Sequence, residues 1–181
     1  MEADKFDPKA LRNALGTFAT GVTVITTLAQ EKNAYGIVTE KPVAMTANSF
    51  ASVSLDPPLI LWSIAFSAQC YDVFDAAGYF AVHILHGGQI GLSDLCATKN
   101  VDKFAGINWH AGIHGIPILD DYNACFQCSV ENKYSSGDHL IIIGRICEFD
   151  NREKETHAEP LLFYGGSYQS LAQTTNSNRN K

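Results

Sequence analysis

The chain has 181 residues and a mass of 19.7 kDa, which suits a single domain. Hydrophobic residues make up 46% of the sequence, so a core can form, but charged residues make up only 18%. So few charges favour a protein that hides part of its surface in an oligomer. The 13 Lys and Arg against 19 Asp and Glu give a net charge of −6, and no basic run occurs, which argues against nucleic acid or a membrane as the main partner.

The lack of a recognisable targeting signal and the pattern of cysteines both favour a cytoplasmic protein. Residues 1–10 are charged and lack the apolar segment of a signal peptide, and no apolar stretch is long enough to span a bilayer. The five cysteines are odd in number and scattered, which is typical of reduced thiols. Cys125 and Cys128 form a C-x-x-C motif on a run that alternates like a strand, where residues three apart face opposite sides. We therefore expect no metal site.

The first predicted element is a short amphipathic helix that starts at Asp7-Pro8 and is broken by Gly21. Strand-like runs rich in β-branched and aromatic residues follow. They are Val22–Leu28, Val43–Phe50, Leu59–Ile64, Tyr79–Leu85, Ala124–Lys133, His139–Phe149 and Leu161–Tyr164. Two helices interrupt the series, one from a Ser67 cap to a stop at Gly78 and one at roughly Gln89–Ala97.

The order of these elements predicts a mainly β fold. No βαβ alternation repeats, which favours an antiparallel barrel with a few flanking helices over a doubly wound parallel sheet. Tyr79–Leu85 and Leu140–Ile143 are apolar on both faces, as expected if the second face lies under a helix or a second subunit. We expect one domain over residues 1–172 and a polar, disordered tail over residues 173–181.

Common catalytic motifs are missing from the sequence. It has no G-x-G-x-x-G after a strand, no P-loop, no G-x-S-x-G and no H-E-x-x-H. His110 and His114 have the i, i+4 spacing of helical metal ligands, but Gly112, Gly115 and Pro117 disfavour a helix there. We predict a loop without a metal.

Three segments are candidates for ligand binding. In Val43–Leu59, hydroxyl and amide side chains alternate with small residues, which suits either a planar polar ligand or a plain edge strand before a rigid Asp-Pro-Pro turn. Gly137-Asp138 predicts a hairpin that places His139 at a barrel mouth, where it can contact a ligand or be incidental. Tyr164–Tyr168 holds two glycines between aromatic residues, which suits a strand bulge or a ligand lid.

Together and in this order, the segments resemble the small flavin reductases with an FMN-binding split-barrel fold. That family includes the reductase components of two-component flavin-dependent monooxygenases. The resemblance covers about residues 11–171, and Thr46–Leu59 and Gly137-Asp138-His139 carry it most specifically. Supporting matches are Leu11–Val24, Phe80–Leu85, Asp102-Lys103-Phe104 and Tyr164–Tyr168.

The resemblance implies an antiparallel split β-barrel that forms a homodimer and binds FMN or FAD in a groove at the dimer interface. It implies an NAD(P)H:flavin oxidoreductase that moves a hydride from NADH or NADPH to the flavin. Reduced flavin would then pass to a separate monooxygenase component. The sequence has no cluster of Arg residues to bind the 2′-phosphate of NADPH, which favours NADH.

The resemblance also assigns site residues. The flavin ring would lie against Met45, Thr46, Ala47, Asn48 and Ser49. The ribityl chain and phosphate would meet Ser63, Ser67, Cys96, Ala97 and Lys103, with Ser67 capping a helix whose N-terminus suits an anion. His139 would be the catalytic residue, orienting the nicotinamide or managing a proton, with Tyr168 on the same side.

Some positions depart from the family pattern. Residues 65–70 lack the Arg and Thr that help many relatives hold phosphate, His83 stands where Asn is common, and Cys96 stands where Phe is common. The choice between FMN and FAD therefore stays open. Two alternatives also stay open: a flavoprotein that holds FMN tightly for electron transfer or ferric reduction, and a binding module without catalysis.

Overall fold

The computed structural model describes residues 6–32, 34–152 and 158–172, so the predicted tail at 173–181 lies outside the described residues. The helices are α1 (Pro8–Leu15), α2 (Tyr71–Ala76) and α3 (Ile90–Ala97), with 3₁₀ turns at Gly87–Gln89, Lys103–Gly106 and Ile113–Gly115. The strands are β1 (Thr20–Gly21), β2 (Thr23–Lys32), β3 (Val38–Ala47), β4 (Ala51–Leu55), β5 (Pro58–Ala65), β6 (Tyr79–Ile84), β7 (Trp109–Ala111), β8 (Pro117–Leu119), β9 (Ala124–Ser136), β10 (His139–Asn151), β11 (Leu162–Tyr164) and β12 (Ser167–Gln169).

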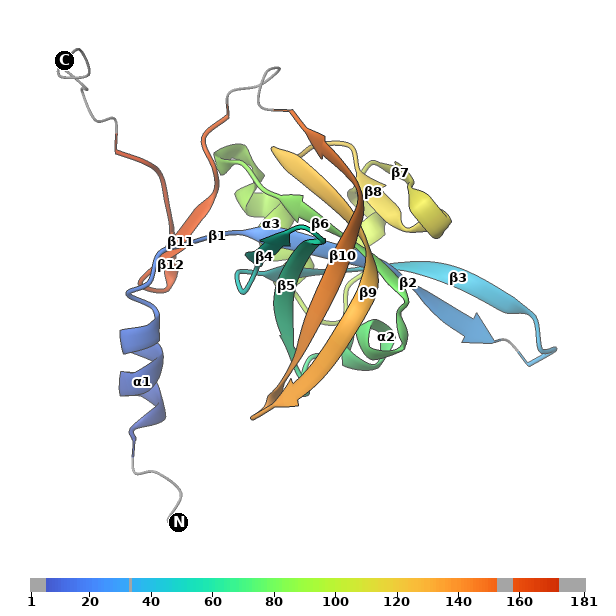
Figure 1. The fold of residues 1–181 in the computed structure, drawn as a ribbon, viewed down its shortest axis with the longest axis horizontal. Helices are drawn as coiled ribbons and strands as arrows, with labels where there is room; N and C mark the ends of the chain where they lie inside the picture. Colours follow the sequence, from blue (N-terminus) through green and yellow to red (C-terminus); the bar gives the residue numbers. More distant parts are fainter. Residues whose placement is uncertain (1–5, 33, 153–157, 173–181) are drawn as a thin grey trace.

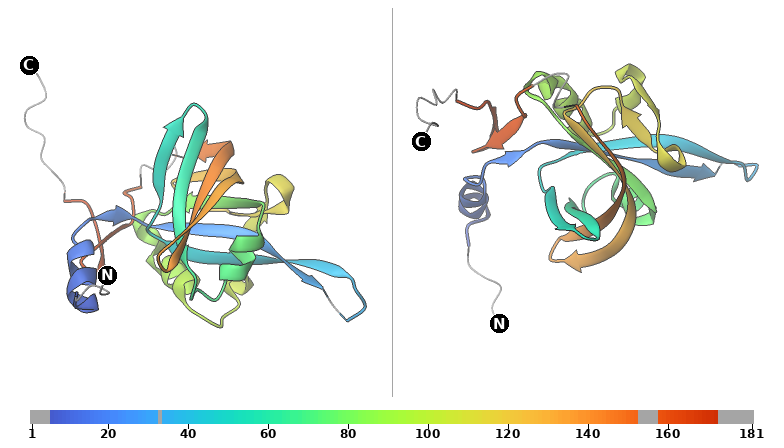
Figure 2. Two further views of the ribbon diagram at one scale, coloured as in Figure 1. Left: turned by 60° about the horizontal axis from the view of Figure 1, so that its bottom comes forward. Right: turned by 45° about the horizontal axis from the view of Figure 1, so that its top comes forward.

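Seven strands form the main sheet, in the order β3-β2-β6-β9-β10-β5-β4, and every neighbouring pair is antiparallel. The sheet curls into a split barrel with β3 and β4 at its edges (Figure 1). The long hairpin of β2 and β3 projects from one side of the barrel, and α1 stands apart on the other side near β11 and β12 (Figures 1 and 2). The predicted antiparallel barrel is confirmed.

Large aromatic side chains fill the barrel interior. The ring of Trp62 on β5 meets the edges of Phe74 and Phe80 at centroid distances of 5.0 and 5.8 Å. All three side chains are almost completely buried, and Ile25 and Ile142 from facing strands join the same cluster. Burial of this much apolar surface is the main force that closes the sheet around its core.

The prediction that some strands bury both faces is confirmed for β6. Phe80 and Val82 point into the barrel, whereas Ala81 packs outside against Ile116 and Ile118 of the β7–β8 segment. The same alternation separates the two cysteines of the C-x-x-C motif, because Cys125 joins the outer cluster and Cys128 the inner one. Among the described residues, no group of His, Cys, Asp or Glu could hold a metal ion.

Hairpin turns occur where the glycines predict them. Gly137 has a positive φ and joins β9 to β10 with Asp138, so that Ser136 and His139 pair directly. Gly165 and Gly166 both have positive φ and join β11 to β12, with Tyr164 opposite Ser167. The Tyr164–Tyr168 segment is therefore a hairpin with a two-residue turn, so its interpretation as a bulge was wrong, and its role as a ligand lid stays a prediction.

Two predicted helix boundaries were also wrong. Helix α1 begins at Pro8 with Asp7 as its cap, as predicted, but it ends at Leu15 rather than near Gly21. Helix α2 begins at Tyr71, not after Ser67, and its N-cap residue Cys70 makes no side-chain cap bond. Among the described helices, none has the length and apolar character needed to cross a bilayer.

Gly144 on β10 gives a direct test of barrel packing. A Cβ atom at this position would overlap the ring of Phe80 and touch Cβ of Cys128 at 3.0 Å. We expect Gly144→Ala to lower the free energy of unfolding by about 3 kcal/mol, because the central strands cannot move apart without opening the core. Urea denaturation followed by tryptophan fluorescence measures the loss.

Gly91→Ala in α3 is the matched control for that substitution. Space around Gly91 is open, and alanine favours a helix, so this variant should be at least as stable as the parent protein. Equal denaturation midpoints for the Gly144 and Gly91 variants would contradict the packing described for β10.

Candidate functional site

The candidate site is a cavity of about 600 Å³ between β3 and two loops. Its floor is the Pro42–Thr46 stretch of β3. One wall is Ala68–Cys70, which leads into α2, and the other is Cys96–Phe104, which begins in the last turn of α3. Five residues assigned by the family resemblance line it: Met45, Thr46, Cys96, Ala97 and Lys103.

Thr46 is fixed in one orientation at the cavity floor. Its hydroxyl donates to the carbonyl of Ser93 on α3 at 2.6 Å. Since that bond uses the only hydroxyl hydrogen, Thr46 has lone pairs left and can accept a hydrogen bond from a ligand N–H group. The neighbouring Met45 lies with its sulfur 3.8 Å from the thiol of Cys70 in the first wall.

Lys103 holds the second wall to the floor. Its ammonium group donates to the carbonyl of Ala44 at 2.8 Å and to that of Cys96 at 2.6 Å. Cys96 lies in the last turn of α3, where a cation also complements the helix dipole. An ammonium group has three donors, so one remains for a ligand anion. That Lys103 supplies the positive charge that binds a phosphate remains a prediction. Two of its three N–H donors already bind backbone carbonyls.

The cavity carries more positive than negative side chains, although the protein is acidic. Lys41, Lys99 and Lys103 line it against Glu31 and Asp102. Lys41 lies 3.7 Å from Glu31 in an exposed pair that contributes little to stability. Lys99 forms no ion pair with any other described residue. A local excess of positive charge suits an anionic ligand.

The two cysteines in the cavity wall are neutral thiols at physiological pH. Burial raises the pKa of Cys96 to about 11, although the Lys103 charge opposes the shift. Burial likewise raises the pKa of Cys70. Both side chains therefore behave as small apolar groups rather than as thiolate nucleophiles.

Tyr168 lies behind the cavity rather than in its lining. Its hydroxyl donates to the carboxylate of Asp94 at 2.7 Å and lies 2.9 Å from the hydroxyl of Ser93. Because Ser93 also accepts from Thr46, these bonds link the β11–β12 hairpin through α3 to the cavity floor. Burial is the largest cause of the raised pKa of Tyr168, so its phenol stays protonated and can donate.

Other predicted residues lie beside the cavity, on the β3–β5 side. The hydroxyl of Ser49 accepts from the backbone N–H of Ser63 and donates to its carbonyl, both at 3.0 Å. This pair joins the connection between β3 and β4 to β5. Asn48 is exposed at the end of β3, whereas Ala47 is buried in the barrel core. None of these four residues lines the cavity.

Ser67 does not cap a helix. It lies exposed in the turn before α2, which is a six-residue helix too short to form an anion site at its N-terminus. The turn is held instead by tertiary contact, since the N–H of Phe66 donates to the carbonyl of Asp138 at 3.0 Å. The predicted capping role of Ser67 was wrong.

His139 lies at the barrel mouth, as the hairpin predicts. It begins β10 opposite Ala65, and its side chain is 44% exposed. Its Nδ1 lies 2.6 Å from the carboxylate of Asp138. The hydrogen bond from His139 lowers the pKa of Asp138, so the carboxylate stays ionised and accepts from Nδ1–H. Nε2 is then the imidazole atom that can face a ligand. His139 lies beside the turn that leads to the first wall, not in the cavity lining.

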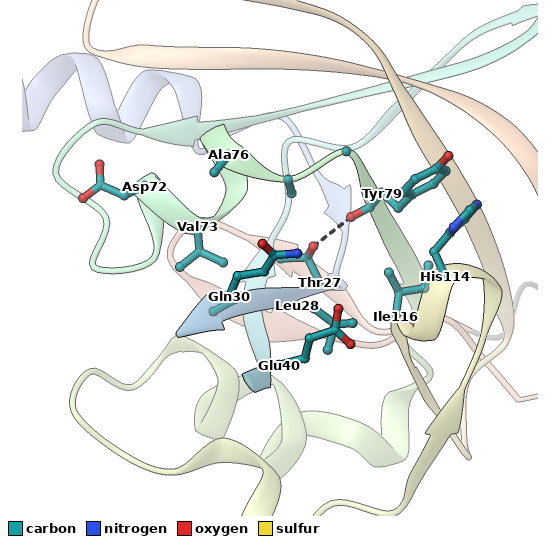
Figure 3. Close-up of a pocket in the computed structure, with 13 residues that line it drawn as sticks. Thr27, Leu28, Gln30, Glu40, Asp72, Val73, Ala76, Tyr79, His114 and Ile116 are labelled. Carbon is teal, nitrogen blue, oxygen red and sulfur yellow. Dashed lines mark hydrogen bonds between the residues drawn. The ribbon is translucent and has the colours of Figure 1, made fainter. Parts of the chain in front are cut away.

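A second cavity of about 600 Å³ lies between β2, α2 and the start of β6 (Figure 3). Thr27 there donates to the carbonyl of Tyr79, whose ring stacks on His114 at 3.8 Å. Glu40 and Asp72 make this lining acidic. No residue assigned by the family resemblance lines it, and its charge suits an anionic ligand less well than that of the first cavity.

Sequence reasoning missed several residues that line the first cavity or support it from behind. Ser93 is completely buried and accepts from Thr46, and Gln69 and Asn100 join the two walls through side-chain hydrogen bonds. No motif marks these residues. Asn100 has a positive φ, which Asn tolerates better than most residues, but its neighbours give no turn signal strong enough to predict it.

Comparison with known proteins places the chain in a family. Residues 15–172 match the model of the "Flavin reductase like domain". The FMN reductase (NADH) SmoA of Agrobacterium fabrum is 39% identical over 88% of this chain and 84% of its own length. A probable flavin reductase of Rhizobium meliloti is 46% identical over 83% of this chain, but the chain spans only 46% of that relative's length.

A solved structure gives the same result at the level of the fold. A homologue of nitrilotriacetate monooxygenase component B from Mycobacterium thermoresistibile superposes with a TM-score of 0.83, at 34% identity over 99% of this chain and 94% of that one. The antiparallel split barrel, the matched residues and these relatives agree, and the chain belongs to the flavin reductase family.

Proposed function

We propose that this protein is an NADH-dependent flavin reductase that binds FMN in the cavity above β3 and supplies reduced flavin to a separate monooxygenase. One observation carries the proposal. The cavity gathers five of the residues that the family resemblance assigns to the flavin, and it carries the local positive charge that a phosphorylated cofactor needs. SmoA, named as an FMN reductase that uses NADH, supports the choice of cofactor and hydride donor.

The residues present fit a flavin. A volume of about 600 Å³ is in the range of sites for small cofactors. The thioether of Met45 and the neutral thiols of Cys70 and Cys96 offer apolar contact to a planar ring, while Thr46 offers an acceptor to a ring N–H. Lys99 and the third donor of Lys103 lie where a phosphate can be held.

A bound flavin supplies the redox chemistry, which is acceptance of a hydride from the nicotinamide. The protein's residues then have three tasks, all of them positional. The floor residues orient the ring, the second wall fixes the phosphate, and His139 meets the nicotinamide through Nε2. A strong general acid or base is unnecessary for this reaction.

His139→Ala should lower kcat with NADH about tenfold while leaving the dissociation constant of FMN within twofold. The reason is that His139 lies outside the cavity lining, so its loss removes contact with the nicotinamide rather than with the flavin. Stopped-flow absorbance at 340 nm measures the turnover, and calorimetric titration measures FMN binding.

His110→Ala is the matched control for His139. His110 is also an exposed histidine that faces a carboxylate, with Nδ1 3.0 Å from Asp120, and it lies on β7 away from the cavity. It should leave kcat unchanged. An unchanged kcat in both histidine variants would remove His139 from the site.

The proposal includes a homodimer and a cytoplasmic location. Exposed apolar side chains along and after α1 support self-association, since Leu15 and Phe18 are 68% and 78% exposed. The low charge content also supports self-association, as do Ile141 and Ile143, which are half-buried on the outer face of β10. The free state of the five cysteines agrees with a reducing compartment. Sedimentation equilibrium tests the dimer, and a monomer at micromolar concentration would contradict it.

The enzyme itself is tested by NADH oxidation without and with added FMN. We expect oxidation to depend on added flavin and to produce reduced flavin under anaerobic conditions. Failure to oxidise either nicotinamide nucleotide with FMN, FAD or riboflavin would overturn the proposal. Retention of flavin through gel filtration would indicate a tightly bound flavoprotein instead.

A further inference from the structure

The two walls of the candidate flavin cavity are joined by a pair of amide side chains. Nε2 of Gln69 donates to Oδ1 of Asn100 at 2.8 Å, and the backbone N–H of Asn100 donates to Oε1 of Gln69 at 3.1 Å. The two residues line the cavity and are 31 positions apart in the chain. Within the described parts of the chain, these are the hydrogen bonds that connect residues 66–70 with residues 98–102.

The backbone of Asn100 is shaped for this pairing. Its φ is +59°, in the left-handed region that most side chains avoid and that Asn adopts more readily. The side-chain amide of Gln69 both donates and accepts, whereas Asn100 accepts through its side-chain Oδ1 and donates through its backbone N–H. Because both side chains are exposed, solvent competes with these bonds, and a ligand can open them at a modest free-energy cost.

The floor beneath the pair is held independently. Cys70 contacts Met45 from the first wall, and Lys103 binds Ala44 and Cys96 from the second. The Gln69–Asn100 pair therefore does not set the position of β3. It sets the distance between the outer parts of the walls, at the end of the cavity beside Lys99.

We propose that Gln69 and Asn100 form a strap that closes this end of the cavity and makes the protein prefer a flavin mononucleotide over a flavin dinucleotide. The inference rests on the proposed flavin site. A mononucleotide ends at its phosphate and fits beneath the closed strap. A dinucleotide continues beyond the phosphate into a second phosphate and an adenosine, so it must break the two amide hydrogen bonds to bind.

The expected effect is a change in the ratio of affinities rather than a general loss. In Gln69→Ala, the dissociation constant of FAD should fall about tenfold relative to that of FMN, which is the effect expected from two exposed hydrogen bonds. Asn100→Gly keeps the backbone N–H and the positive φ but removes Oδ1, so it should give a smaller change in the same direction. Gln30→Ala, an exposed glutamine of the other cavity, should leave the ratio unchanged.

Calorimetric titration of each variant with FMN, FAD and riboflavin in the absence of NADH tests the strap by binding alone. The values of kcat/KM for FMN and FAD are then measured as a second readout. A preference for FMN in the parent protein and a graded gain of FAD binding in the two variants would support it. An unchanged ratio in Gln69→Ala would overturn it. A loss of FMN binding relative to riboflavin would also overturn it, because Gln69 would then be a phosphate ligand. If the parent protein binds no flavin, the proposed function fails instead.

Discussion

Ala97→Trp should weaken FMN binding about 100-fold, with a matching loss of kcat/KM. Ala97 is the last residue of α3 and lines the candidate flavin cavity. Its side chain is exposed, so an indole can project into the cavity without overpacking the protein core. The indole and the ribityl phosphate of a bound flavin would then compete for the same volume. Calorimetric titration with FMN measures the loss.

The structure offers a closely matched control in Ala76→Trp. Ala76 is also an exposed alanine near the end of a helix, and it lines the second cavity of the same volume (Figure 3). That variant should bind FMN with the affinity of the parent protein. If Ala76→Trp abolished binding while Ala97→Trp preserved it, the flavin would have to occupy the cavity beside β2 and α2.

The second large effect concerns the pH dependence of folding. His83 on β6 is completely buried, its Nδ1 lies 3.1 Å from the carbonyl of Val24, and its Nε2 accepts from the N–H of Leu119 at 3.1 Å. This arrangement requires the neutral ring with its proton on Nδ1. Burial, which is the largest cause, lowers the pKa of His83 from 6.5 to about 4, and the hydrogen bond to Val24 opposes the shift.

The direction of the pH effect follows from proton binding. Between pH 6.5 and about 4, the unfolded chain binds a proton at His83 and the folded protein does not. The free energy of unfolding should therefore fall as the pH falls through this window, by about 3 kcal/mol in total. Above pH 6.5 both states are neutral at this residue, and its contribution is constant.

His83→Asn is the informative variant for this prediction. An asparagine amide can donate to Val24 and accept from Leu119, but it does not titrate. Urea denaturation between pH 7.5 and pH 4.5 should show a flatter stability profile for the variant than for the parent protein. Parallel profiles would contradict the assignment and would place the acid sensitivity outside His83.

Much of the fold could be predicted because it depends on local patterns. Runs of β-branched residues mark the strands, and Gly137-Asp138 marks a two-residue turn that the register of β9 and β10 confirms. The boundary of α2 could not be predicted in this way. Ser67 is a good cap by composition, but the bond from Phe66 to Asp138 fixes the turn and delays the helix to Tyr71.

The candidate site depends more on contacts between distant residues. The family resemblance assigns Met45, Thr46 and Lys103 to the flavin, and in the structure all three line one cavity. The sequence does not show which acceptor each hydrogen-bond donor binds in the folded protein. Lys103 donates two hydrogen bonds, to the carbonyls of Ala44 and Cys96, which lie 59 and 7 residues away in the chain. These contacts are visible only in the folded protein.

Determination of the crystal structure of the protein with FMN bound tests the central claim most directly, because two cavities of equal volume compete for the ligand. We predict the flavin ring against Met45 and Thr46 and the phosphate beside Lys99 and Lys103. A flavin in the cavity between β2 and α2, beside Tyr79 and His114, would contradict this account.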